Sequence, residues 1–213
     1  MNQNIHAASP ELSSIEVENL SRSTFIMRGA LAAGAAYGAL AVGPLVRSAF
    51  AQGSNGDLEI LNFALTLEYL EAAFYAEGGK QVKGVPGDIA KLVKTFGDQE
   101  QEHVDALTAT IEDLGGKPVE APGVDFGDAF ASADSFLATA IVFEDLGVSA
   151  YNGAAPAIKS KDLLATAGGI VQIEARHAAA IRYAAGEPPA PEAFEPSATT
   201  DEVLKAVEPF LAK

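Results

Sequence analysis

The chain has no cysteine and little positive charge, and both shortages limit what it can do. Without cysteine there is no disulfide, thiolate ligand or thiol nucleophile, so a metal site must use carboxylate and imidazole groups. The 14 lysines and arginines form no cluster and are outnumbered by 29 acidic residues, which leaves a formal net charge of −15. Such a chain repels a phosphate backbone, so nucleic acid is not an expected partner.

Residues 1–51 differ from the rest of the chain and are interpreted as a signal peptide. They contain a polar start with two arginines, an Ala/Gly-rich apolar run over 29–46 and a small-x-small triplet at 49–51. This pattern predicts cleavage before Gln52 and a mature protein that is periplasmic or extracellular. A retained membrane anchor is the alternative, although the run is just under the ~20 residues that a span needs.

The export route stays open. Residues 21–26 resemble a twin-arginine signal, but Ser23 stands where the second arginine belongs, so the twin-arginine and the general secretory routes are both compatible. No membrane span is expected to remain after cleavage.

The rest of the chain has no strand pattern, and its apolar residues recur at helical spacing. The segment 115–132 holds several prolines and glycines and is too long for a tight turn, so it is interpreted as a crossover. These features predict one all-α domain over 52–186, followed by a Pro/Glu-rich linker and a short helix within 187–213. The expected helices span residues 57–77, 88–114, 133–153, 162–185 and 200–211.

Both halves of this domain carry the same pattern of possible metal ligands. A single glutamate is followed about thirty residues later by Glu-x-x-His, and residues at i and i+3 of a helix lie on one face. The neighbours of these residues at helical offsets are apolar, so the carboxylates and imidazoles are expected to point into the bundle. The candidate ligands are Glu68, Glu100, His103, Glu144, Glu174 and His177.

Four carboxylates in one core are unstable unless cations neutralise them or their pKa values rise. Two divalent ions would balance four negative charges. Oxygen and imidazole ligands without sulfur favour iron or manganese, and the choice between these two metals stays open.

Three other residues are candidates near this site. Glu71 is either an acceptor for a ligand imidazole or an alternative ligand to Glu68, and the repeat favours Glu68 because Gly147 takes the place equivalent to Glu71. Tyr75 and Tyr151 follow the single glutamates by two helical turns. They are candidates for hydrogen bonding to the carboxylates or for a redox role, with ordinary core residues as the alternative.

Over residues 56–186 the chain resembles the ferritin-like superfamily, most closely the exported ferritin-like domain proteins of bacteria, and its Glu-x-x-His motifs are similar to those of rubrerythrin. The resemblance implies a four-helix bundle of two hairpins joined by one long crossover. It also implies a dinuclear site in which Glu100 and Glu174 bridge the two ions. A rubredoxin-like centre is excluded because it requires cysteine.

The same resemblance implies redox chemistry on O2 or peroxide in stress defence, of an oxidase, peroxidase or catalase-like kind, without identifying the catalytic residues. Two alternatives remain: a metal-binding or storage protein without turnover, and a structural stress-related protein with a vestigial site. A homo-oligomer is compatible with all three.

Overall fold

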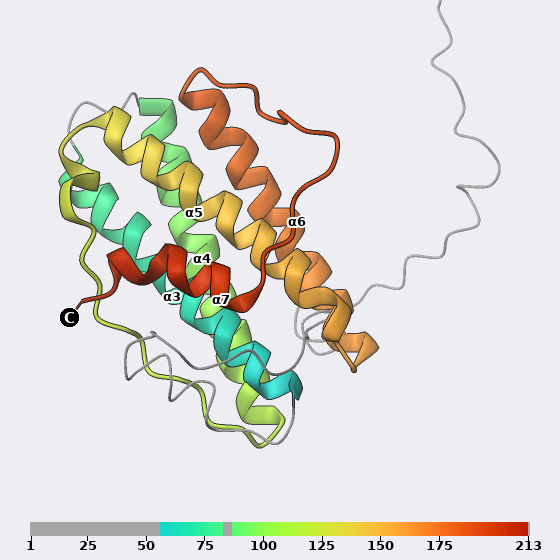
Figure 1. Cartoon of the computed structure of the whole chain (residues 1–213). Coiled ribbons are helices and arrows are strands. Elements are labelled where there is room, and N and C mark those ends of the chain that lie inside the picture. The colour runs from blue at the N-terminus through green and yellow to red at the C-terminus, as the bar shows by residue number, and fades with distance from the viewer. Residues whose placement is uncertain (1–55, 83–86, 213) are drawn as a thin grey trace, which may run out of the picture.

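The computed structural model describes residues 56–82 and 87–212, and this part of the chain is almost entirely helical (Figure 1). The predicted all-α fold is confirmed. The expected signal peptide and its cleavage site lie outside the described residues. No helix within the described ranges has both the length and the apolar character of a membrane span. The helices are α3 (Gly56–Gln81), α4 (Gly87–Asp113), α5 (Ala133–Ala154), α6 (Lys161–Ala184) and α7 (Thr200–Val207), with short 3-10 segments at Gly127–Phe130, Ala155–Ala157 and Glu208–Phe210.

The four long helices form two hairpins, as expected. Helix α3 packs along α4 and α5 along α6, and the hairpins meet where α3 faces α5 and α4 faces α6. The segment between α4 and α5 is the long crossover, which lets the second hairpin lie beside the first (Figure 1). Helix α7 crosses the outside of the bundle and buries Val203, Leu204 and Val207 against it.

Helix α3 continues beyond its expected end. The sequence predicts a loop from Gly78, but the helix runs on to Gln81. Gly78 is buried, and a Cβ there would lie 2.3 Å from the ring of Phe136 on α5. The glycine therefore permits close packing between the hairpins instead of ending the helix.

Side-chain hydrogen bonds hold the crossover to the bundle. The amide of buried Asn62 accepts a hydrogen bond from the Val119 N–H (2.8 Å) and donates to the Leu58 carbonyl (3.1 Å). At the far end Ser132 caps α5 through a capping box with Ser135. The Asn62 bonds satisfy polar groups that would otherwise be partly buried without partners.

The core consists of two apolar clusters at opposite ends of the bundle. The cluster around Phe74 stacks aromatic rings from α3, α5 and the crossover, with Phe74 and Phe136 nearly parallel at 4.9 Å. The other cluster contains Leu61, Leu107 and Ile170. On α4 and α6 the buried glutamates fall between the positions of the two clusters, and together with Glu68 of α3 and Glu144 of α5 they form a polar layer inside the core.

Candidate metal centre

The polar layer contains all six candidate ligands. Helices α3 and α5 each contribute one glutamate, and α4 and α6 each contribute a Glu-x-x-His pair. The four glutamates are fully buried, His177 is 1% exposed, and the side chain of His103 is 12% exposed. Burial follows from the local sequence, because apolar residues one turn before and after each glutamate fix which face of the helix turns inward.

Three of these residues surround the imidazole of His103. Its Nδ1 atom lies 2.9 Å from Oε2 of Glu100, 3.1 Å from Oε2 of Glu68 and 3.2 Å from Oε1 of Glu174. Donor atoms that share one ion at bonds of about 2.0–2.2 Å lie roughly 3 Å apart. The spacing therefore fits a single cation held by three carboxylates and one imidazole.

A second group surrounds His177. Its Nδ1 atom lies 2.7 Å from Oε1 of Glu100 and 3.4 Å from Oε2 of Glu144, and Glu174 completes the group. In both groups every residue offers a donor atom within 4.8 Å of the others. Two neighbouring cation positions are thus outlined.

The two groups share Glu100 and Glu174. The two oxygens of Glu100 are divided between the groups, with Oε2 beside His103 and Oε1 beside His177. Glu100 thus has the arrangement that a bridging carboxylate would need, and Glu174, the other residue for which bridging is expected, belongs to both groups.

Five of the buried ligand atoms lack hydrogen-bond partners, whereas Nδ1 of His103 is hydrogen-bonded to Glu68 and Glu100. Although Oε1 of Glu100 and Nδ1 of His177 are close, neither atom makes a hydrogen bond, and the same holds for both oxygens of Glu174 and for Oε2 of Glu144. Buried acceptors without donors are unfavourable by about 1–3 kcal/mol each, and more when charged. The chemistry of the set therefore fits divalent cations, since these would satisfy all of the atoms together.

The two tyrosines bond to these carboxylates across the hairpins. The Tyr75 hydroxyl on α3 donates to Oε1 of Glu144 on α5, and the Tyr151 hydroxyl on α5 donates to Oε1 of Glu68 on α3. Each tyrosine thus hydrogen-bonds to the single glutamate of the opposite hairpin. The other oxygen of that glutamate, Oε2, lies beside an imidazole. The expected hydrogen bonds are present, and no feature of the sequence indicates their crosswise pairing.

Sequence reasoning missed two residues that orient His177. Gln99 on α4 lies with its Oε1 atom 2.7 Å from Nε2 of His177, and this contact places the ring proton on Nε2 and leaves Nδ1 free to bind a cation. The ring of Phe96 stacks on the imidazole at 4.0 Å. Their positions, next to Glu100 and one turn before it, are the only sequence signal that points to them.

Glu71 lies beside both groups and belongs to neither. Its carboxylate is buried near Gly147 of α5, where a Cβ would lie 3.1 Å from Oε1 of Glu71 and 2.9 Å from Oε2 of Glu174. The absent side chain at 147 therefore makes room for two carboxylates. The role of Glu71 next to the candidate ligands stays a prediction.

Without a cation, several of these acids hold protons. Burial raises the pKa of Glu174 well above its usual range, and the Glu100 charge adds to this effect. Burial likewise raises the pKa of Glu71, and repulsion from Glu174 raises it further. Burial also raises the pKa of Glu144 to about 7. Mutual repulsion in a buried site thus favours neutral carboxyl groups.

Glu100 and the imidazoles are shifted in the opposite sense. Burial disfavours the Glu100 anion, but contacts with His103 and His177 outweigh it and lower the pKa to about 2. Burial also disfavours imidazolium, yet Glu100 and Glu144 raise the pKa of His177 to about 10, and Glu68 raises that of His103 well above its usual value. Protons thus balance charge in the metal-free site, and cation binding must displace them.

The chain was compared with protein families, with curated proteins and with solved structures. Residues 56–187 match a family model described as Ferritin-like domain. Among solved structures, a dodecameric thioferritin, the bacterioferritin-related protein of Bacteroides fragilis, is 22% identical, with 65% of this chain and 84% of that chain covered and a TM-score of 0.49. No curated protein matches the chain.

Proposed function

This chain belongs to the ferritin-like domain family, and on that premise we propose that it is an exported redox protein with two iron or manganese ions that acts on O2 or peroxide. The bound ions would supply the electron transfer. The ligand set is that of the two groups described above: Glu68, Glu100, His103, Glu144, Glu174 and His177.

One observation carries the proposal: several of the buried donor atoms converge without hydrogen-bond partners. Five of the six buried side-chain atoms without a partner in the described chain belong to the candidate ligands. A protein that only needed a stable bundle would bury apolar residues here, because unpartnered buried charges reduce stability. The arrangement is therefore favoured by a function that binds cations.

The surrounding residues prepare the site for such a reaction. Tyr75 and Tyr151 hold one oxygen of each single glutamate, which limits how these carboxylates can rotate. Gln99 and Phe96 likewise limit the rotation of the His177 ring. Since the four ligand glutamates are fully buried, charge at the site is screened less than it would be in water.

The first test is the metal content of the full chain, expressed in cells supplied with both iron and manganese. We expect two iron or manganese ions per chain, and large losses in the His103→Ala and His177→Ala variants. Glu102→Ala is the matched control, because Glu102 is exposed on the same helix as His103. Equal occupancy in all three variants would refute the ligand assignment.

A second measurement separates the proposal from its alternatives. The metal-loaded chain should consume O2 or hydrogen peroxide over many turnovers. Full metal occupancy without turnover would favour a binding or storage protein, and storage would also require a large homo-oligomer in light scattering. Absence of metal after reconstitution would favour a structural protein with a vestigial site.

The export part of the proposal rests on residues 1–51 alone. We expect the mature chain to begin at Gln52 and to be recovered outside the cytoplasm. Mass spectrometry of the protein from fractionated cells checks this, and a full-length chain in the cytoplasmic fraction would contradict it.

A further inference from the structure

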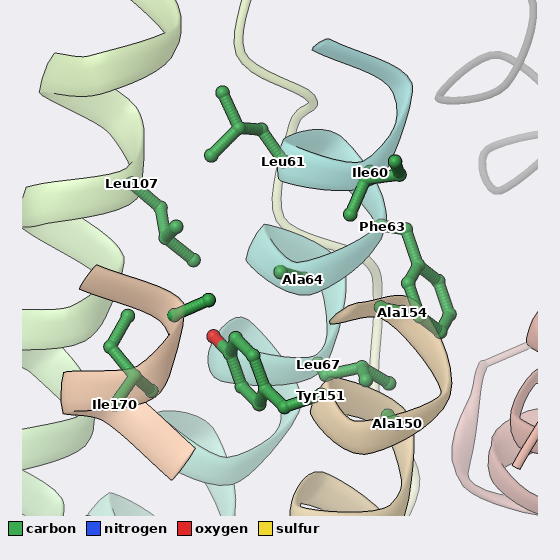
Figure 2. A pocket seen from close by; sticks show the side chains of 11 residues that line it. Ile60, Leu61, Phe63, Ala64, Leu67, Leu107, Ala150, Tyr151, Ala154 and Ile170 are labelled. Carbon is green, nitrogen blue, oxygen red and sulfur yellow. The ribbon is translucent and has the colours of Figure 1, made fainter. Parts of the chain in front are cut away.

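An apolar cavity lies next to the candidate metal centre, in the cluster around Leu61. Side chains from all four long helices line it (Figure 2). The pocket is partly open to solvent, and the space inside it has room for a molecule about the size of water. Tyr151 is the one lining residue with a polar side-chain atom, and its hydroxyl donates to Glu68.

The cavity lies one helical turn from the ligand layer. Ala64 precedes Glu68 by four residues, Ile170 precedes Glu174 by four, and Leu107 follows His103 by four. Four residues of helix advance about 6 Å. Tyr151 joins the two regions directly, because its ring lines the cavity and its hydroxyl bonds to a candidate ligand.

Small side chains create this space. Ala64, Ala150 and Ala167 approach it from three different helices, where larger residues would fill it. Apart from the Tyr151 hydroxyl, the lining side chains are hydrocarbon, so a water molecule inside would find only the Tyr151 oxygen as a side-chain partner. A buried water ordinarily makes about three hydrogen bonds, so this apolar lining disfavours water relative to an apolar gas.

We propose that this pocket binds a small apolar gas, which for the proposed function is dioxygen, and delivers it to the candidate metal centre past Tyr151. Hydrogen peroxide is disfavoured in this pocket, because its hydrogen-bonding groups would find only the Tyr151 oxygen as a partner there. The identity of the gas rests on the proposed function, whereas the preference of the pocket for an apolar gas does not.

Xenon is the probe for the pocket itself. Crystals of the full chain under xenon pressure should show one xenon atom against Ala64, Leu107 and Ile170, both with and without metal. Ala167→Val should abolish the xenon peak by filling the space, and Ile60→Ala should increase its occupancy. Gly168→Ala is the matched control, since a Cβ at Gly168 meets no atom within 4 Å. Absence of xenon from the wild-type cavity would overturn the proposal.

A kinetic comparison tests delivery. In the ferrous-loaded protein, Ala167→Val should slow oxidation by O2 several-fold and leave oxidation by hydrogen peroxide unchanged, at unaltered metal content. Equal slowing with both oxidants, or none with O2, would overturn the delivery role. If the chain binds no metal, the proposed function fails, and the xenon result still decides whether the pocket takes an apolar gas.

Discussion

At the scale of single residues, the centre depends on how buried carboxyl groups with similar surroundings acquire different charges. Glu100 contacts both imidazoles, whereas Glu174 shares its space with Glu71 and lacks a hydrogen-bond partner. The pKa of Glu100 is therefore lowered and that of Glu174 raised. These opposite pKa shifts predict that replacement by glutamine will change the free energy of unfolding in opposite directions at the two positions.

Glu174→Gln should stabilise the metal-free protein at pH 7. Because its pKa is higher in the folded chain, Glu174 contributes stability while it is protonated, and this contribution is lost as pH rises from about 4.5 through the raised pKa. Glutamine does not ionise, so the variant does not lose this stability as the pH rises. Urea unfolding of the metal-free variant should therefore show a higher free energy of unfolding than wild type at pH 7.

Glu100→Gln should have the opposite effect in the same experiment. A folded-state pKa of about 2 means that the Glu100 anion contributes stability above about pH 4.5 and loses it as pH falls toward 2. Each pKa unit corresponds to about 1.4 kcal/mol, so a loss of up to about 3 kcal/mol is expected at pH 7. Changes of equal sign in the two variants would contradict the charge distribution described here.

At the scale of elements, glycines allow segments to approach each other closely. Gly78 lets α3 pack against Phe136, and Gly153 lets the segment after α6 cross α5. A Cβ at Gly153 would lie 1.8 Å from the carbonyl oxygen of Ala198, whose N–H donates to the Ser149 carbonyl. The docking of α7 depends on this crossing, because α7 follows Ala198 directly.

Gly153→Ala should therefore displace the segment before α7. We expect a loss of about 1–3 kcal/mol in the free energy of unfolding from the backbone shift, and faster proteolysis within residues 187–198. Gly168→Ala, on an open helix position, should instead be neutral or gain about 0.5–1 kcal/mol. Thermal unfolding and limited digestion of both variants test this, and identical behaviour would refute the crossing as a constraint.

Helix positions followed closely from the sequence, whereas the ends of α3 and α7 did not. Helix α7 ends at Val207 and a 3-10 segment follows it, although the sequence predicts a helix to residue 211. The start of α5 after Ser132 agrees with its expected span because the capping residues are local. The predicted end of α3 was wrong because glycine usually stops a helix. Only the facing ring of Phe136 shows that Gly78 permits close packing instead. Contacts of this kind are invisible in a single segment.

At the scale of the whole molecule, a buried acidic layer opposes folding unless ions compensate it. The chain carries a formal net charge of −15, and its four most buried glutamates lie in one layer. A cation that binds only the folded chain stabilises it by mass action. Metal should therefore be a main determinant of the stability of this fold.

Removal of metal by a chelator should lower the midpoint of thermal unfolding. Free metal at a hundred times the dissociation constant corresponds to about 2.7 kcal/mol for one site. The shift should be largely lost in His177→Ala and retained in Glu102→Ala, as scanning calorimetry with and without chelator would report. A wild-type midpoint that does not depend on metal would contradict this account.

The sequence by itself determined the helices, their hairpin order and the six candidate ligands, because helical periodicity and Glu-x-x-His spacing are local properties of the chain. Only the tertiary structure decided the crosswise tyrosine bonds, the division of the Glu100 oxygens between two imidazoles, the contact from Gln99 and the cavity beside Tyr151. Each of these depends on the distance and angle between helices that are remote in sequence, and packing of the whole bundle sets both.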